Sequence, residues 1–202
     1  MTSGLPDDVR SILDARFEAR EKAITESRKV IRSAANAIRS LHRSEWDEAD
    51  RLIEDSGSRL ATINQTLLGH PELISHAVVI DAAKEYAEAW ITRAVFVGDT
   101  IPNFKDLEMD PIPYLHGLGE AVGEMRRRML DMLRADRLDE AETLLEQMDA
   151  IVDQLAEVDY PDGMTNGLRR VTDISRSLVE RSRADLTATV VQERLRRDLG
   201  AK

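Results

Sequence analysis

Cysteine is absent from this 202-residue chain, which excludes disulfides, zinc–thiolate sites, iron–sulfur clusters and cysteine nucleophiles. Aromatic residues make up only 4% of the sequence, and there are only 6 Pro and 10 Gly. A β-sandwich normally uses more aromatic residues and more turns, so this composition favours long amphipathic helices. No apolar run approaches the roughly 20 residues that a membrane span needs, and the first residues lack a basic stretch followed by an apolar one. We therefore expect a soluble, cytoplasmic protein with no membrane partner.

Charged residues make up 33% of the sequence, and the formal net charge is −10. This balance argues against a protein that wraps nucleic acid over its whole surface, but it is compatible with a local basic groove. Only five of the 28 basic residues are Lys. The excess of Arg reflects either a GC-rich genome or the use of guanidinium groups for bidentate phosphate contacts.

The apolar pattern predicts helices throughout. Phe17, Ile24, Ile31 and Ile38 recur every seven residues, which indicates one long helix from Pro6 to about residue 42. Ser44 is a candidate N-cap for the second helix. Further helices are expected, in chain order, over residues 44–69, 71–97, 113–133, 136–158 and 164–184, with a short last helix or tail at 185–199. No strand-like alternation occurs, so we predict an all-α, single-domain bundle of six or seven helices over residues 1–202.

The expected third helix carries an acidic stripe. Between residues 77 and 97 it is apolar almost all round, which predicts burial on most sides. Its polar exceptions include four residues spaced 4, 3 and 4 apart on one helical face: Asp81, Glu85, Glu88 and Thr92. Buried carboxylates are costly unless an Arg, a metal ion or a water-filled cavity compensates them.

The expected fourth helix repeats this pattern. His116, Glu120 and Glu124 are spaced four residues apart in a segment that is otherwise weakly polar. Three glycines surround them, at positions 117, 119 and 123. Because glycine lowers helix stability, this cluster indicates a close backbone approach to a neighbouring helix.

Packing of these two helices would gather four carboxylates around one point: Glu85, Glu88, Glu120 and Glu124. Oxygen ligands without thiolates suit Mg²⁺ or Mn²⁺. The alternative is a pair of solvated acidic faces, which are common in a chain with 38 acidic residues. A di-iron centre is disfavoured, because it normally needs Glu-x-x-His on two helices and no His lies three residues after a Glu. His116 by itself is more typical of a packed or capping histidine than of a ligand.

Arginines also follow helical spacing. Four lie on one side of the first helix, at positions 28, 32, 39 and 43, and Arg126–Arg128 form a run at the end of the fourth. Each group is either a solvated face with local ion pairs or part of a phosphate-binding groove. No nucleotide-binding loop, dinucleotide fingerprint or nucleophile–His–acid arrangement with signature spacing is present.

Three segments resemble the translin family, which comprises translin and its partner Trax. Residues 84–89, KEYAEA, are similar to the E-Y-V-E-A segment of Trax. Residues 114–126, YLHGLGEAVGEMR, resemble the family signature Y-L-x-G-V-x-D/E-L-x-G-E-L-x-R. Residues 168–185 resemble the C-terminal helix of the family, and the similarity extends to the region of Ser27 and Arg28. The short chain looks like an archaeal or bacterial member.

The resemblance implies a seven-helix protomer that assembles into a hollow octamer. Translin-like subunits bind single-stranded RNA or DNA, and Trax-like subunits cleave single-stranded RNA with Mg²⁺ held by acidic residues. Those acids correspond to Glu85, Glu88 and Glu120, with Glu120 one methylene longer than the usual Asp. A further Trax acid falls on Ala82.

We therefore predict a Mg²⁺-dependent (or Mn²⁺-dependent) endoribonuclease that acts on single-stranded RNA. Glu85, Glu88 and Glu120 are the expected catalytic and metal-binding residues, with Glu124 as a further ligand. The expected nucleic-acid contacts are Arg28, Arg32, Arg126 and Arg127. The expected assembly is a homo-oligomer, an octamer by resemblance. The alternatives are a non-catalytic binder of single-stranded RNA or DNA, and a helical scaffold that binds neither.

Overall fold

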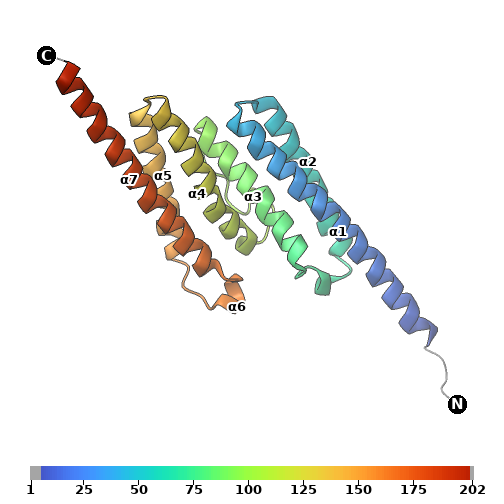
Figure 1. The fold of residues 1–202 in the computed structure, drawn as a ribbon. Coiled ribbons are helices and arrows are strands. Elements are labelled where there is room, and N and C mark those ends of the chain that lie inside the picture. The colour runs from blue at the N-terminus through green and yellow to red at the C-terminus, as the bar shows by residue number, and fades with distance from the viewer. Residues whose placement is uncertain (1–5, 201–202) are drawn as a thin grey trace. The chain divides into compact units, whose positions relative to one another are not determined.

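The computed structural model describes residues 6–200, and in this part of the chain every regular element is a helix (Figure 1). In chain order these are α1 (Asp7–His42), α2 (Trp46–Leu67), the short 3₁₀ helix η1 (Pro71–Leu73), α3 (Ala77–Val97), α4 (Pro111–Arg134), α5 (Leu138–Ala156), α6 (Asp162–Thr165) and α7 (Leu168–Gly200). The prediction of an all-α fold is confirmed. None of these helices is both long enough and apolar enough to cross a membrane.

Contacts divide the chain into two compact units, and the boundary lies inside α3, between Ala89 and Trp90. The first unit contains α1, α2, η1 and most of α3. The second contains the end of α3 and all of α4 to α7. Organisation of residues 1–202 as one domain stays a prediction.

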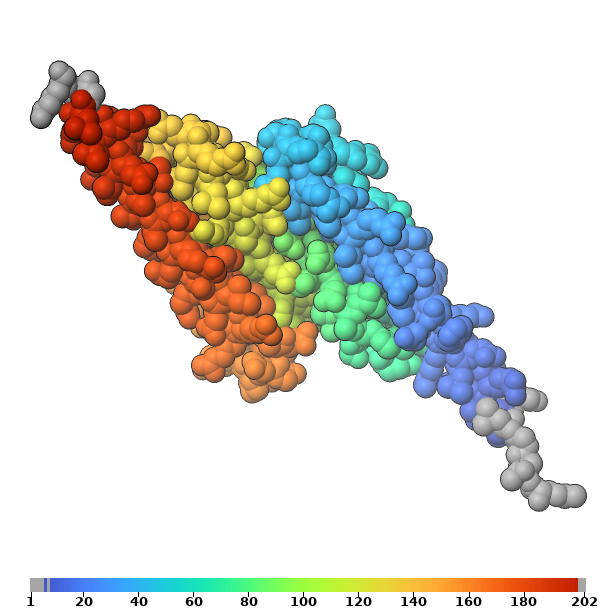
Figure 2. Space-filling view, in the orientation of Figure 1, coloured from blue at the N-terminus to red at the C-terminus, as the bar shows by residue number. Residues whose placement is uncertain are grey.

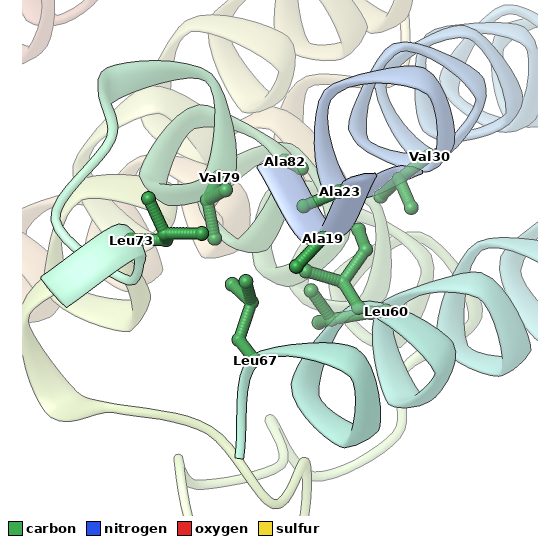
Figure 3. Packing of buried hydrophobic residues seen from close by; sticks show 9 residues of the cluster. Ala19, Ala23, Val30, Leu60, Leu67, Leu73, Val79 and Ala82 are labelled. Carbon is green, nitrogen blue, oxygen red and sulfur yellow. The ribbon is translucent and has the colours of Figure 1, made fainter. Parts of the chain in front are cut away.

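Small side chains on α1 form the core of the first unit. Ala19 and Ala23 are buried on α1 and face Leu60 and Leu67 of α2 (Figure 3). Leu73 of η1 and the first turns of α3 complete this cluster. The alanines allow close packing of the helices, since a short side chain keeps the helix axes near one another.

A polar network also joins α1 to α2. The Arg59 guanidinium donates to Asp55 at 2.9 Å and to Glu26 of α1 at 3.1 Å. Ser33 of α1 donates to the same Asp55 carboxylate at 2.6 Å. The hydrogen bond from Arg59, followed by that from Ser33, holds the pKa of Asp55 below its usual value. The carboxylate form of Asp55 is therefore the one that the fold stabilises.

In the second unit, α4, α5 and α7 pack around fully buried apolar side chains such as Met125, Met148 and Leu155. Gly119 of α4 lies in a close contact with α7. A Cβ added there would lie 2.4 Å from Cγ1 of Val171 on α7, and the Ser175 hydroxyl donates to the Gly119 carbonyl at 3.0 Å. The predicted close approach is confirmed at Gly119, and the neighbouring helix is α7.

Two expected helix starts are wrong. Ser44 has φ of 59°, a left-handed turn conformation, and α2 begins after it at Trp46 without a side-chain cap. Residues 71–76 do not open the third helix: Pro71 starts a single 3₁₀ turn, and α3 begins at Ala77. The His76 carbonyl accepts hydrogen bonds from the first turn of α3, so this residue marks the real start.

The expected break near residue 184 is also wrong, because α7 is one continuous helix. No glycine or proline interrupts residues 168–199. The Thr187 and Thr189 hydroxyls donate to carbonyls one turn earlier, as they do in an unbroken helix. Figures 1 and 2 show the end of α7, in red, extending past the ends of α4 and α5.

The first residue of the long apolar stripe, Phe17, does not contribute to the core. Its side chain is 62% exposed, whereas Ile38 near the end of the same helix is buried. Ile24 and Ile31 are only half-buried, and the fully buried residues of α1 include Val30, Ala34 and Leu41. The seven-residue spacing therefore predicts the helix correctly, but its stripe lies at the edge of the buried face.

Candidate functional site

Glu85 and Glu88 lie close together on α3. One carboxylate oxygen of Glu85 is within 4.8 Å of one from Glu88. Glu88 is buried, with 8% of its surface exposed, and the adjacent residues Ala87 and Ala89 are fully buried. Glu85 is half-buried, and its Oε1 lies 3.6 Å from the Lys84 ammonium. The 3.6-residue period of the helix accounts for this arrangement, because residues i and i+3 share a face.

Two carboxylates at this separation repel one another in their ionised forms, and burial of Glu88 makes its charge more costly. Positive charge nearby stabilises the pair, and the Lys84 ammonium supplies part of it. A divalent cation would supply more, and its preferred ligands are carboxylate oxygens.

Thr92 lies one turn after Glu88 on the same helical face. Its side chain is fully buried, and within residues 6–200 its Oγ1 has no hydrogen-bond partner. Buried hydroxyls in helices normally donate to a carbonyl one turn earlier or to water. An unsatisfied buried oxygen beside two carboxylates fits a site that takes a hydrated cation. Asp81, the first residue of the stripe, is exposed.

Glu120 and Glu124 lie one turn apart on α4, in the second unit, and both are half-buried. The residue before Glu120 is Gly119, whose tight contact with α7 fixes the rotation of α4 about its own axis. His116, one turn earlier, is buried, and its ring Nε2 donates to the Thr165 carbonyl at 2.9 Å. His116 therefore ties α4 to α6, which agrees with its interpretation as a packed histidine.

The predicted basic residues of α4 have different surroundings. The Arg126 guanidinium donates to the Ser182 hydroxyl at 2.8 Å and to Asp185 at 2.7 Å, both on α7. The Arg128 guanidinium stacks 5.0 Å from the centre of the Phe96 ring. Arg127 is exposed and makes no hydrogen bond or ion pair with any residue that the structure describes. Arg126 thus contributes to helix packing, and Arg127 presents its charge to solvent.

The arginine stripe of α1 divides into two parts. Arg39 and Arg43 donate to side chains close by in sequence: Arg39 to Asn36, and Arg43 to Glu45 at 2.6 Å. Arg28 and Arg32 are exposed one turn apart, and neither forms an ion pair or hydrogen bond within residues 6–200. These two guanidinium groups can therefore contact a phosphate backbone without breaking an existing interaction.

An open pocket of about 790 Å³ in the second unit was not predicted as a site. It lies between the end of α5 and the start of α7, and Tyr160, Arg169 and Arg176 contribute to its lining. Three aspartates share the lining, so the charge of the arginines is offset: Asp159, Asp162 and Asp173. The sequence signal was the turn at Tyr160 and Pro161, which indicates a loop but no chemistry.

Comparisons place this all-α chain among known proteins. No protein-family model matches it. An uncharacterized protein of Methanocaldococcus jannaschii is 29% identical over 182 residues, which cover 89% of this chain and 80% of that protein. The sequence of AfC3PO is 29% identical to this chain, and its crystal structure matches with a TM-score of 0.85 over 92% of this chain and 97% of AfC3PO. A structure of AfC3PO with duplex RNA matches equally well over 96% of that chain. Apo-NeC3PO shares the fold, with 20% sequence identity and a TM-score of 0.83. The match covers 93% of this chain and 99% of the NeC3PO chain.

The fold and its neighbours define a class of all-α proteins that includes AfC3PO and NeC3PO, which are translin-family proteins. At 29% identity to AfC3PO over most of the chain, these likenesses support membership of the translin family. The resemblance seen in the sequence is thereby confirmed.

Proposed function

We propose that this protein is a divalent-cation-dependent endoribonuclease that acts on single-stranded RNA. The observation that carries the proposal is the pair of neighbouring carboxylates, Glu85 and Glu88, on a largely buried helix. Such a pair offers two oxygen ligands on one helical face, which favours a role in binding a cation.

In this proposal Glu85, Glu88 and Glu120 together hold one Mg²⁺, with Mn²⁺ as an alternative. Each residue offers one carboxylate oxygen, and Glu124 either adds a further oxygen or orients Glu120. The donor set is oxygen-only, which suits a hard cation. A cation in this position would neutralise charge that develops on the scissile phosphate and would acidify a coordinated water. The protein's own contribution would be to supply these carboxylate oxygens as ligands.

Arg28 and Arg32 are proposed to contact the RNA backbone, since their guanidinium groups are exposed on α1. Arg127 is proposed as a further phosphate contact, and Arg126 as one that would act while bound to Asp185. AfC3PO, at 29% identity, has been solved in a complex with duplex RNA, which supports RNA as the ligand. That complex makes duplex RNA a necessary comparison in any binding experiment.

Self-association into a homo-oligomer is part of the same proposal, with an octamer as the expected size. The support is the number of apolar side chains that stay exposed along the long helices, including Ile12, Phe17, Val191 and Leu195. Monomeric soluble proteins seldom leave such apolar stripes uncovered. Light scattering that gives about 23 kDa at micromolar protein, a value close to the 22.7 kDa of one chain, would contradict this part.

The test is a cleavage assay with end-labelled single-stranded RNA, duplex RNA and single-stranded DNA. Each substrate is incubated with Mg²⁺, with Mn²⁺ and with EDTA. We expect cleavage of single-stranded RNA with either cation and none in EDTA. Glu85→Gln and Glu120→Gln remove a ligand charge at almost constant volume, so both should lose cleavage while RNA binding persists.

Glu146→Gln is the matched control, because Glu146 is an exposed glutamate on α5 and outside the proposed site. It should cleave like the wild type. Binding of single-stranded RNA without cleavage under every condition would instead favour the non-catalytic binder. Full cleavage by the Glu85→Gln/Glu120→Gln double variant, or in excess EDTA, would refute the metal site.

A further inference from the structure

Lys84 directly precedes the carboxylate pair of α3, and all three residues lie in the first unit. The Lys84 ammonium is 3.6 Å from Oε1 of Glu85, and 18% of the lysine side chain is exposed. A lysine side chain usually extends into solvent, because its ammonium group is strongly hydrated. The Lys84 ammonium is instead held beside the carboxylates.

Helical geometry also brings Lys84 within reach of the second carboxylate. Glu88 follows Lys84 by four residues, so the two residues share a face of α3. The only other basic residue in the sequence of α3 is Arg93, whose guanidinium donates to Asp99. Lys84 is thus the residue of α3 whose positive charge lies at the carboxylate pair.

A lysine in this position competes with a divalent cation. Both need the same carboxylate oxygens, and two positive charges at such close range repel one another. Binding of a cation therefore weakens the interaction between Lys84 and Glu85. The lysine stem is flexible, so the ammonium group can move away without any change in the helix.

The displaced ammonium group needs a new anionic partner, and an RNA strand at the site supplies one. An ammonium group binds phosphate as a point charge, which tolerates the varied positions of a flexible strand. The exposed guanidinium groups of Arg28 and Arg32 carry their charge whether or not a cation is bound. Lys84 differs from them, because its charge is engaged until the carboxylates have another partner.

We propose that Lys84 exchanges partners: it pairs with the carboxylates of Glu85 and Glu88 when they hold no cation, and with RNA phosphate when they do. The inference rests on the cation site proposed above and adds a substrate-binding residue to it. It also makes the binding of cation and RNA mutually supportive through one side chain. Such coupling is reciprocal, so each ligand raises the affinity of the other by the same factor.

The first experiment titrates the full-length protein with Mn²⁺ in the absence of RNA, using electron paramagnetic resonance. Lys84→Met keeps most of the stem and removes the charge. We expect its Mn²⁺ dissociation constant to fall about fivefold, which corresponds to the loss of one competing ion pair. Lys84→Arg keeps the charge and should stay close to the wild type. A purely structural role would instead leave Mn²⁺ binding unchanged or weaken it.

Lys29→Met is the matched control, since Lys29 also pairs with a glutamate, Glu26, at 2.7 Å, but on α1. Its Mn²⁺ binding should equal that of the wild type. Circular dichroism verifies that each variant is folded. Lys84→Gln is a second variant without the charge, and it replaces Lys84→Met if that protein does not fold.

The second experiment measures binding of a 2′-O-methyl single-stranded RNA by fluorescence anisotropy, in EDTA and in saturating Mn²⁺. A gel verifies that the RNA is intact after each measurement. Mn²⁺ should raise the RNA affinity of the wild type, and this rise should be about fivefold smaller in Lys84→Met, which lacks the released charge. Lys29→Met should show the same rise as the wild type.

The outcomes separate the two claims. If the wild type binds no Mn²⁺, the cation site of the proposed function is wrong, and the role of Lys84 is wrong with it. If the wild type binds Mn²⁺ and Lys84→Met binds it no more tightly, the cation site stands and the competition by Lys84 is refuted. If Lys84→Met binds Mn²⁺ more tightly but Mn²⁺ raises its RNA affinity as much as in the wild type, Lys84 does not contact RNA and the exchange of partners is overturned.

Discussion

Gly119 provides the sharpest test of how α4 packs against α7. A methyl group at this position would lie 2.4 Å from Val171 Cγ1 and 3.3 Å from Leu155 Cδ1. Ordinary contact needs more than 3.4 Å, so Gly119→Ala requires a shift of about 1 Å between two helices, or a change of the Val171 rotamer, which a helix restricts. Overpacking of this size costs about 1–3 kcal/mol, while replacing Gly in a helix gains about 1 kcal/mol. We expect a net loss of up to about 2 kcal/mol.

Gly123, one turn later on α4, is the matched control. Its added methyl would meet Leu178 Cδ1 at 4.0 Å, which is ordinary contact. Gly123→Ala should therefore be neutral or stabilising by up to about 1 kcal/mol. The assay is urea unfolding followed by circular dichroism at equilibrium.

A double-mutant cycle identifies the clash itself. Val171→Ala removes Cγ1, so Gly119→Ala should cost less in the Val171→Ala background than in the wild type. If Gly119→Ala is as stable as Gly123→Ala, or if Val171→Ala brings no relief, the tight contact described here does not exist.

Three further expectations follow from the same contacts. The hydrogen bonds of Asp55 lower its pKa, so the ionised carboxylate stabilises the fold fully above the usual Asp pKa of about 4. This stabilisation is lost as the pH falls through the lower pKa of the folded state. Over this pH range, Asp55→Asn should therefore lose less unfolding free energy than the wild type, as measured by acid unfolding. Arg28→Ala/Arg32→Ala should weaken RNA binding about tenfold and make the dependence of affinity on salt shallower, as measured by fluorescence anisotropy at several salt concentrations. Arg126→Ala should lower the free energy of unfolding by about 1–2 kcal/mol in urea, because it removes two hydrogen bonds to α7; unchanged stability would show that these bonds are not formed in solution.

Local periodicity accounts for most of what could be predicted from the sequence. The spacing of Glu85 and Glu88 places both on one face of a helix, and their carboxylate oxygens lie within 4.8 Å in the structure. The three glycines of α4 indicated a close approach, which Gly119 makes with α7. Helix periodicity is set by neighbours in the sequence, so such features can be predicted before any tertiary contact is known.

Contacts between distant segments could not be predicted in this way. Arg126 and Arg127 are adjacent in the sequence, yet only Arg126 is bound by Asp185, 59 residues away. The packing of α7 on α4 decides which of the two arginines forms this hydrogen bond, and no local sequence pattern encodes that packing. The continuity of α7 was missed for a related reason: its second half is rich in charged residues and looks like a tail, although no glycine or proline occurs between residues 168 and 199.

The central claim is a cation site built from Glu85, Glu88 and Glu120, and Mn²⁺ titration monitored by electron paramagnetic resonance tests it without RNA. Free Mn²⁺ gives a strong signal that disappears on binding, so the number of bound ions per chain is read directly. We expect one site in the wild type and in Glu146→Gln, competed by Mg²⁺, and its loss in Glu88→Gln and in Glu120→Gln. Undiminished Mn²⁺ binding in both Glu88→Gln and Glu120→Gln would contradict the account.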